Sequence, residues 1–423
     1  MFLLNVIFIF LFFAKINCYV DYSNYSLFNI LIRNEKDLKI YEDLEKTFPL
    51  DKLDFWFQGR SPGFPIKLFT SPKSTAKIKN YLNVRNYDFN ITTKDWNEMF
   101  PKPQTIRRLS SNLNNVFQHN IYHSYDEIID FLKLQEKNHK EFVSVRVYGE
   151  SYEKRLLYYV KIGYSNGKEK PMVVIDAGMH AREWVTHSSI LFITDHIIKN
   201  IKNYKEILEK FDIVIFPVLN PDGYVYSRIG DRMWRGNRNI NNNEKCGVDL
   251  NRNYPFLWKG HSDICLTYPG IHELSELESM YHSIYVERNK HLIKGYITFH
   301  SYGRLILLPW TDPKKREEAY YDEMISLGSK MKKEINYKRG KSYEVGDAAE
   351  ILYPANGASD DWIKSLGVKY VYTVELSPDK DTSTNGFTVK EDQITTIGEE
   401  ALIIFDIMLH QVYSELLLNV IEF

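Results

Sequence analysis

Residues 171–184 read PMVVIDAGMHAREW, an apolar run that breaks at a glycine and continues as a polar segment. A short apolar run rich in valine and isoleucine is typical of a buried strand, and ligands of open α/β sheets gather at the carboxyl ends of such strands. His180 and Glu183 follow the run directly and stand three residues apart. A pair with this spacing also occurs by chance in loops, so the remaining chain has to show whether it belongs to a metal site.

Four more apolar runs between residues 155 and 376 have the same character, and stretches with helical spacing separate them. A last stretch at 399–418 is amphipathic, which favours packing of this helix against a core. Alternating strands and helices predict an α/β sheet domain. The runs are RLLYYVKIG (155–163), FDIVIFPVL (211–219), KGYITFH (294–300) and KYVYTVEL (369–376), and the helical stripe is Leu402, Phe405, Leu409, Val412 and Leu416.

A smaller unit precedes this domain and extends from about residue 19 to residue 108. It ends in PKPQTIRRLSSNLNN (101–115), where prolines, a dibasic pair and a polar run are typical of an exposed, cleavable linker. The position of Arg107 and Arg108 between two folding units favours proteolytic processing there. Short apolar runs at 26–32, 53–57 and 65–69 alternate with helix-like stretches at 35–48 and 74–82, which predicts a small α+β unit.

Residues 1–18, MFLLNVIFIFLFFAKINC, form an apolar segment where a secretory signal belongs. The segment is too short to span a bilayer comfortably, so we expect a signal peptide that is removed near Cys18. An uncleaved membrane anchor is the alternative. With Cys18 at the edge of the signal, Cys246 and Cys265 remain as a closely spaced pair, and such a pair in an exported chain suggests one disulfide.

The composition excludes some partners. The chain has 423 residues, and 44% hydrophobic with 14% aromatic content is ample for a buried core. Its formal net charge of -1 provides no global field that would recruit nucleic acid or an anionic membrane. N-glycosylation sequons stand at Asn24 and Asn90, and none follows residue 109. We therefore expect a secreted, extracellular monomer with neither nucleic acid nor a membrane as a partner.

Two further strand ends carry residues that could join His180 and Glu183 in a catalytic site. ITF leads into His300, and YVYTV leads into Glu375. Catalytic zinc takes three ligands from histidine and carboxylate side chains and leaves a position for water, so His180, Glu183 and His300 would hold one Zn²⁺ ion. Because Glu183 would be bound to the metal, the base must come from elsewhere, and Glu375 is the candidate.

A second group of polar residues lies in DRMWRGNR (231–238) and DLNRN (249–253). Asn251 with the planar fork of Arg252 could clamp a carboxylate, and a separate arginine near zinc would stabilise an oxyanion. Taken singly, each of these residues is more often structural, because strand-end histidines are usually hydrogen-bonded and loop arginines are usually solvated. Their occurrence together with the metal pattern favours a functional role.

In this combination the sequence resembles the zinc metallocarboxypeptidases of the pancreatic carboxypeptidase A/B type, and it is most similar to their B-type proenzymes. The resemblance implies a mixed central β-sheet flanked by helices in a catalytic domain at 109–423, preceded by an inhibitory α+β activation prosegment at 19–108. The motifs that carry it are HAREW (180–184), NPDGY (220–224), MWRGNR (233–238), GVDLNRN (247–253), FHSYG (299–303), YPANGASDDW (353–362) and TVEL (373–376).

The resemblance also implies a role for each candidate residue. Glu375 matches the general base that activates water, Arg235 matches the residue that polarises the scissile carbonyl, and Asp249 matches the partner that orients the first histidine ligand. The implied metal ligands are His180, Glu183 and His300, and the implied substrate contacts are Arg182, Asn251, Arg252, Tyr302, Thr311, Tyr353 and Asp360.

Asp360 concerns specificity, because it matches the position at the base of the pocket for the terminal side chain. A buried carboxylate needs a matching cation, so Asp360 predicts a preference for terminal Lys or Arg over Phe or Leu. Thr311, small and polar at another pocket position, is consistent with this, and Asp361 is expected to be structural. The alternatives are that Asp360 points to solvent and that the preference is apolar or broad.

Two features depart from the family pattern. The loop LSPDKDTSTNGF (376–387) is longer than usual and lacks the usual arginine, and Cys246 stands one residue closer to GVDLNRN than expected.

We expect a zymogen that a trypsin-like protease activates near Arg107 or Arg108 and that acts on peptide or protein C-termini. The rival is a non-catalytic, carboxypeptidase-like protein that binds C-termini, which would be expected to lose a metal ligand or the base.

Overall fold

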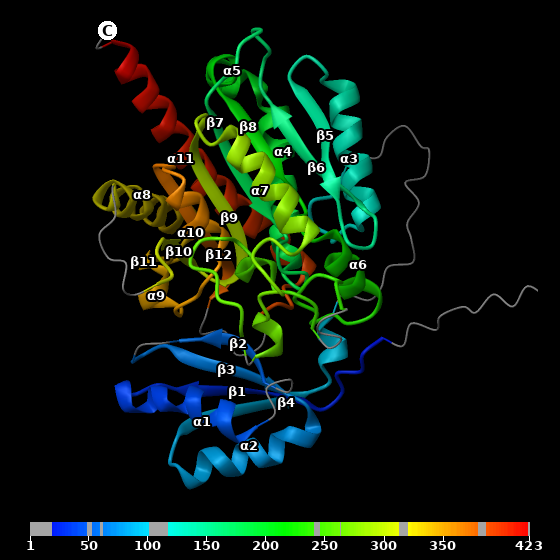
Figure 1. The fold of residues 1–423 in the computed structure, drawn as a ribbon, viewed down its shortest axis with the longest axis vertical. Helices are drawn as coiled ribbons and strands as arrows, with labels where there is room; N and C mark the ends of the chain where they lie inside the picture. Colours follow the sequence, from blue (N-terminus) through cyan, green and yellow to red (C-terminus); the bar gives the residue numbers. More distant parts are fainter. Residues whose placement is uncertain are drawn as a thin grey trace, which may run out of the picture.

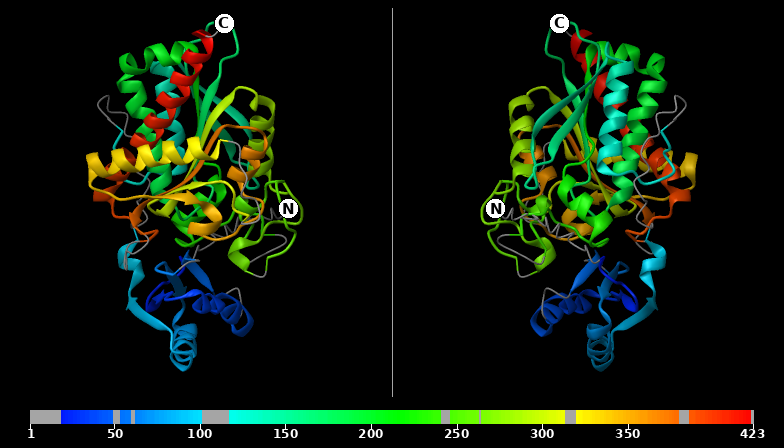
Figure 2. Two further views of the ribbon diagram at one scale, coloured as in Figure 1. Left: turned by 90° about the vertical axis from the view of Figure 1, so that its left-hand side faces the viewer. Right: turned by 90° about the vertical axis from the view of Figure 1, so that its right-hand side faces the viewer.

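Two β-sheets organise the chain, and each forms the centre of its own unit (Figure 1). The N-terminal unit lies at one end of the larger unit in both side views (Figure 2). The expected signal peptide at 1–18 and the pair Arg107-Arg108 lie outside the described residues. The structure is a computed structural model that describes residues 19–48, 53–59, 62–100, 117–240, 246–262, 264–312, 320–379 and 386–421.

The N-terminal unit is a four-stranded antiparallel sheet in the order β2-β3-β1-β4, so β2 and β4 are its edges. Alternate side chains of β1, such as Phe28 and Ile30, pack with Ile78 and Leu82 of α2. The predicted α+β unit is confirmed, although β4 was not among the predicted strands. The elements are β1 (Tyr25–Leu31), α1 (Ile40–Thr47), β2 (Asp54–Gln58), β3 (Pro65–Thr70), α2 (Pro72–Val84) and β4 (Asp88–Lys94).

The larger unit contains an eight-stranded sheet in the order β11-β10-β12-β9-β7-β8-β6-β5. Strands β12, β9, β7 and β8 run parallel to one another. Strand β6 runs antiparallel to both of its neighbours, and β10 runs antiparallel to β12 but parallel to β11. The sheet is therefore mixed, as predicted. The strands are β5 (Val143–Glu150), β6 (Leu156–Ile162), β7 (Met172–Ala177), β8 (Asp212–Phe216), β9 (Ile293–Gly303), β10 (Leu305–Leu308), β11 (Glu344–Asp347) and β12 (Tyr370–Asp379).

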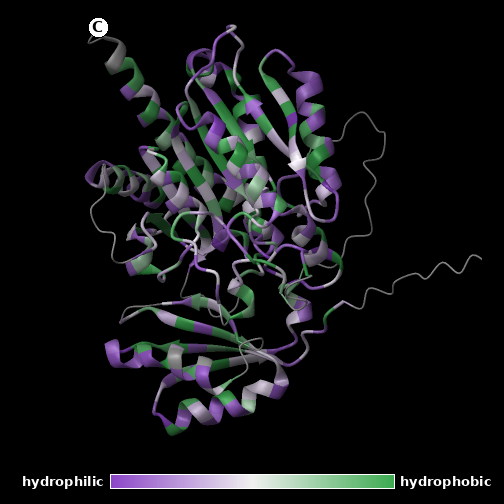
Figure 3. Ribbon diagram, in the orientation of Figure 1, coloured by the Kyte–Doolittle hydropathy of each residue, from purple (hydrophilic) through white to green (hydrophobic). Residues whose placement is uncertain are grey.

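Helices cover both faces of this sheet. Strand β7 places Val173 and Ile175 in one core and Met172 and Val174 in the other, which explains its continuous apolar sequence. Strands β7 and β8 are accordingly largely hydrophobic in Figure 3. One core includes α3 (Tyr125–Asn138), α4 (Trp184–Lys199), α5 (Ile201–Lys210), α8 (Tyr321–Arg339) and α11 (Glu391–Ile421); the other includes α7 (Leu277–Asn289) and α10 (Ser359–Ser365); α6 (Pro221–Ile229) and α9 (Ala348–Ile351) complete the unit.

Helix α11 packs as a core helix. Within the described residues it is long and apolar enough to cross a membrane by length and composition alone, over Glu391–Leu418. Phe405 and Leu409 are nevertheless fully buried, and Leu402 and Val412 lie beside them in the core. The helix contacts α4, α8 and the strands β9 and β12. The predicted packing of this amphipathic stretch is confirmed.

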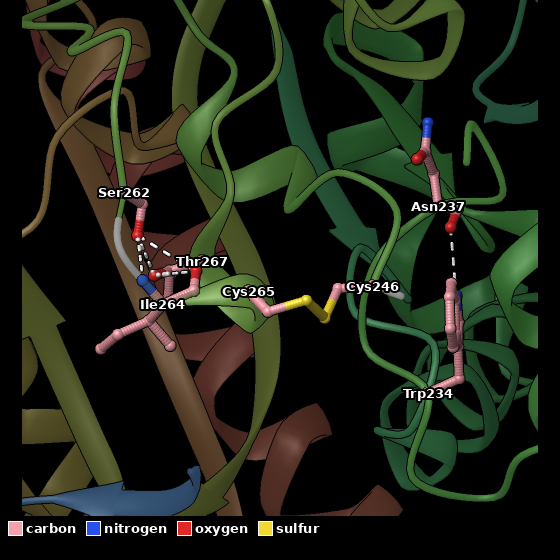
Figure 4. The surroundings of a disulfide bond; sticks show 7 residues. All are labelled: Trp234, Asn237, Cys246, Ser262, Ile264, Cys265 and Thr267. Atoms are coloured by element: carbon pink, nitrogen blue, oxygen red, sulfur yellow. Dashed lines mark hydrogen bonds between the residues drawn. A yellow bond between two sulfur atoms is a disulfide. The ribbon is translucent and has the colours of Figure 1, made fainter. Parts of the chain in front are cut away.

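Cys246 and Cys265 form the predicted disulfide, with their Cα atoms 5.7 Å apart (Figure 4). The turn beside it is held by side chains, because the hydroxyl oxygens of Ser262 and Thr267 lie 2.7 Å apart and the backbone N–H of Ile264 donates to Oγ of Ser262. Ile264 and Thr267 also line the cavity described below. The disulfide thus fixes one wall of that cavity.

Candidate metal centre and active site

Three parallel neighbours, β12, β9 and β7, bring the candidate residues together at their carboxyl ends. Strands β9 and β12 pair in a register that sets Glu375 directly opposite His300. Because residues paired across a ladder project from the same face, both side chains point to one side of the sheet. Strand β7 lies on the other side of β9 and ends at Ala177, so the chain that leaves it enters the space beside His300.

Gly178 turns the chain from β7 toward this space. Its φ of +70° lies in the left-handed region that glycine adopts without steric cost. A Cβ atom there would lie 2.2 Å from Nε2 of the buried His187 in α4, so no larger residue fits without displacing that ring. The turn places His180 between β7 and α4 and puts Glu183 at the N-cap of α4, and both side chains are buried.

His180, Glu183 and His300 converge, with one ligand atom of each within 4.8 Å of the others. Nδ1 of His180 lies 2.7 Å from Oε1 of Glu183 and 3.1 Å from Nδ1 of His300. Nδ1 of His300 in turn lies 3.0 Å from Oε2 of Glu183. Two imidazole nitrogens and a carboxylate are the donor set of many catalytic zinc sites, so these residues fit the metal that the sequence predicts.

The charges of these side chains favour a cation between them. Burial disfavours a charge on His300, but the carboxylate of Glu183 outweighs burial and raises the pKa of His300 to about 9. Burial also opposes ionisation of Glu183, and His180 and His300 outweigh it and hold the pKa of this carboxyl below its usual range. One metal ion at the centre would supply the positive charge that both nitrogens and the carboxylate attract.

Asp249 orients His180 from behind. Its Oδ1 lies 3.0 Å from Nε2 of His180, so Nε2 carries the hydrogen and Nδ1 offers its lone pair to the metal position. Burial raises the pKa of Asp249, but Arg235 and His180 outweigh this effect and keep it well below its usual range. Nη2 of Arg235 donates to Asp249 at 2.9 Å, and Nη1 lies 3.9 Å from Oε1 of Glu183. The guanidinium group therefore faces the metal set.

Glu375 is half-buried and lines the same cavity as the metal set. Burial and the nearby carboxylate of Glu183 raise the pKa of Glu375 to about 8, although His300 and Arg235 oppose the shift. A carboxylate whose pKa is close to neutral accepts and returns a proton readily. This is the property that general acid–base catalysis requires.

Asn251, Arg252 and Tyr353 present hydrogen-bond donors to the cavity. Oδ1 of Asn251 accepts a hydrogen bond from the backbone N–H of Ser359 at 2.9 Å, so its amide NH₂ is the donor that remains for a ligand. Nη1 of Arg252 donates to the backbone oxygen of Asn251, and Nη2 lies 3.3 Å from the hydroxyl oxygen of Tyr353. Together they form a cationic, donor-rich corner that suits a carboxylate.

Asp360 is 2% exposed and lines the cavity, so it does not point to bulk solvent. Its Oδ2 accepts from Oγ1 of Thr373 at 2.8 Å, and it has no ion-pair partner in the described part of the chain. Burial raises the pKa of this carboxyl. Asp361 has a different environment, because it accepts from the backbone N–H and the hydroxyl of Thr311 at 3.0 and 2.5 Å and thereby fixes that residue.

The structure gathers the candidate residues around one cavity of about 90 Å³. Asp249 lies behind its wall, in contact with His180. Side chains of strand β2 and of Leu53, from the N-terminal unit, form part of the lining. The lining includes every metal-binding, catalytic and substrate-binding candidate: His180, Arg182, Glu183, Arg235, Asn251, Arg252, His300, Tyr302, Thr311, Tyr353, Asp360 and Glu375.

The N-terminal unit also contacts the site directly. Oδ1 of Asp54 in β2 accepts from Nη1 of Arg182 at 2.8 Å, in an ion pair whose arginine side chain is only 2% exposed. The guanidinium of Arg182 lies over the ring of Phe387, at 4.2 Å from its centroid. Trp56 and Tyr302 both meet Phe387 edge to face. The N-terminal unit therefore covers the cavity, and its Asp54 engages the guanidinium group of Arg182.

Two of these contacts were not predicted from the sequence. Thr373 stands two residues before Glu375 in β12, so strand alternation places it on the same face and could have identified it as a neighbour of Asp360. Asp54 is separated from Arg182 by 128 residues, and no local pattern relates the two.

The sequence also matches known protein families. The sequence profile of the zinc carboxypeptidase family matches residues 128–403, and that of the carboxypeptidase activation peptide matches residues 28–100. Human carboxypeptidase O is 36% identical over 71% of this chain and 81% of its own length. Carboxypeptidase B of Astacus astacus is 37% identical over 66% of this chain and 93% of its own length.

Solved structures show the same likeness. Carboxypeptidase A from Helicoverpa armigera has a TM-score of 0.82 at 25% identity and covers 93% of this chain and 98% of its own. Thrombin activatable fibrinolysis inhibitor has a TM-score of 0.77 at 28% identity and covers 92% of this chain and 99% of its own. With its converging metal ligands, its covered cavity and both sequence profiles, the chain belongs to the zinc carboxypeptidase family and carries that family's activation peptide.

Proposed function

We propose that this protein is a secreted zymogen whose mature form removes C-terminal Lys or Arg from peptides and proteins. The observation that carries the specificity is Asp360, a buried carboxylate that lines the cavity without a cationic partner among the described residues. Burying a lone carboxylate is costly, and a bound ammonium or guanidinium group offsets that cost. An apolar terminal side chain would leave the charge unpaired.

The proposed roles follow from the groups that line the cavity. His180, Glu183 and His300 would hold one zinc ion, which would supply Lewis-acid chemistry to the scissile carbonyl and to water. Glu375 accepts the proton of the attacking water and returns it to the leaving amine. Arg235, held in place by Asp249, stabilises the negative charge that develops on the carbonyl oxygen.

The substrate's end is held by the donor-rich corner of the cavity. Asn251 and Arg252 bind the terminal carboxylate, and the hydroxyl of Tyr353 closes over it. Asp360 receives the basic side chain, beside the small polar Thr311. Arg182 and Tyr302 contact residues upstream of the scissile bond. This arrangement requires a free C-terminus and so restricts the enzyme to exopeptidase action.

The same proposal assigns three segments. Residues 1–18 are a signal peptide, residues 19–108 are the activation prosegment and residues 109–423 are the catalytic domain. A trypsin-like protease that cleaves after Arg107 or Arg108 would release the cover formed by β2. The mature enzyme is proposed to act as a monomer in the extracellular space.

An activity assay tests this function. After limited trypsin treatment, we expect release of Arg from a peptide that ends in Arg to exceed release of Phe from a matched peptide that ends in Phe. A zinc chelator should abolish both activities, and added Zn²⁺ should restore them. Equal or reversed preference would exclude the basic specificity, whereas activity that survives chelation would exclude the metal-dependent reaction.

The contact between Asp54 and Arg182 predicts the behaviour of the zymogen. A hydrogen bond to a charged group contributes about 1.5–3 kcal/mol, so Asp54→Ala should raise the basal activity of the uncleaved protein on a small Arg-terminated substrate about tenfold. Asp43→Ala is the matched control, because Asp43 lies in α1 of the same unit and pairs with Arg85 rather than with the site. Equal basal activity in all three proteins would show that the ion pair does not hold the cover in place.

A further inference from the structure

We propose that Asn24 and Asn90 are N-glycosylation sites, so that the zymogen carries its N-linked sugar on the prosegment and loses it on activation. The sequons Asn24-Tyr-Ser and Asn90-Ile-Thr are the two in the sequence, and the catalytic domain has none. The inference rests on the proposed secretion, because the sugar donor is encountered only in the secretory pathway.

Asn24 is placed to carry a bulky group. It is exposed and occupies a turn just before β1, with a φ of +59° that asparagine tolerates. Its side chain makes no hydrogen bond within the described part of the chain, so modification of its amide breaks no contact. Ser26, the hydroxyl residue of this sequon, is buried against Thr93, with their hydroxyl oxygens 2.7 Å apart. Sugar transfer at Asn24 therefore has to precede folding of β1 against β4.

Asn90 lies on the exposed edge strand β4 and also makes no side-chain hydrogen bond in the region described. It pairs in register with Asn29 of β1, so the two side chains share one face of the sheet. Oδ1 of Asn29 is buried and has no hydrogen-bond partner among the described residues. A sugar attached to Asn90 would bring N–H and hydroxyl donors beside this acceptor. It would also shield an edge whose backbone groups could otherwise pair with another chain.

The modification is a glycosyl transfer from a lipid-linked oligosaccharide pyrophosphate. The side-chain amide nitrogen of asparagine forms a bond to the anomeric carbon of the first sugar and loses one proton. The bond from that carbon to the pyrophosphate oxygen breaks, and the lipid pyrophosphate leaves with the electron pair. No redox partner is needed, and the neutral amide linkage adds no charge to the prosegment.

The experiment uses the full chain with residues 1–18 replaced by a signal peptide of established function, expressed in a eukaryotic secretory cell line. Protein is recovered from medium and cells together, and its intact mass is measured before and after treatment with an amide-cleaving glycosidase. We expect the mass of two glycans to be lost and both asparagines to be converted to aspartate. After trypsin activation, all sugar should lie on the prosegment fragment.

Matched variants assign each site. Asn24→Gln should remove one glycan and Thr92→Ala the other, whereas Thr92→Ser preserves the sequon and should retain both. Sugar that persists in the variant lacking both sequons, or the absence of removable sugar from the unmodified sequence, would overturn the proposal. A parallel expression with the native residues 1–18 tests secretion separately: if sugar appears only with the replacement signal, the glycosylation sites stand and the proposed secretion fails.

Discussion

Replacement of Glu375 by Gln is expected to lower kcat of the activated enzyme by a factor of about 100 to 10,000 with little change in KM. General acid–base catalysis contributes rate enhancements of this size, and an amide can neither accept nor return the proton. The substitution keeps the size and hydrogen-bonding shape of the side chain, so the cavity should be preserved. The measurement is turnover of an Arg-terminated peptide at saturating substrate, together with the zinc content of each protein.

Two controls make this result specific. Glu323→Gln removes an exposed carboxylate from the first turn of α8 that does not line the cavity, and it should leave turnover unchanged. Zinc content of the Glu375 variant should equal that of the parent, because Glu375 is not among the converging ligands. Normal turnover in the variant would refute the role of Glu375 as base. An unsubstituted protein that bound C-termini with no turnover would instead support the non-catalytic rival.

Much of the fold could be predicted because it depends on local patterns. The runs that became β6, β7, β8, β9 and β12 are short, apolar and bounded by polar segments, and α11 shows a clear helical stripe. Strands β10 and β11 have four residues each, which is too short to show a periodic pattern. Edge strand β4 has no fully buried residue and turns only Phe89 and Ile91 toward the core of its unit, so its alternating apolar pattern is short and weak.

The candidate site likewise combines contacts that the sequence predicts with contacts that it does not predict. His180 and Glu183 could be paired from sequence because a single turn after β7 carries both. The proximity of Glu375 and His300 comes from the register of β12 against β9, which strand patterns alone do not give. Their positions at strand ends made both residues candidates, and the resemblance to a family gave each of them its expected role. The contact of Asp54 with Arg182 depends on how two units pack against each other, and sequence patterning does not determine such packing.

Substitution of Asp360 is also expected to have a large effect on activity. Its carboxylate has only Thr373 and backbone groups as partners in the described structure, so in the proposed complex the basic side chain of the substrate neutralises it. Breaking a buried ion pair by removing one partner costs about 3–5 kcal/mol. Because 1.36 kcal/mol corresponds to a factor of ten, Asp360→Ile should lower kcat/KM for an Arg-terminated peptide at least a hundredfold, by about 3 kcal/mol or more.

The two substitutions Asp360→Ile and Asp360→Asn distinguish the effect of the negative charge at this position from the effect of its polarity. Isoleucine should also raise kcat/KM for a Phe-terminated peptide, because the cavity then offers an apolar surface to the ring and no unpaired carboxylate. Asparagine keeps the size of the side chain and can still accept the hydrogen bond of Thr373, so it should lower the Arg activity without a comparable gain for Phe. If neither variant changed the Arg-to-Phe ratio, Asp360 would not contact the terminal side chain, and the basic preference would have to arise from another wall of the cavity.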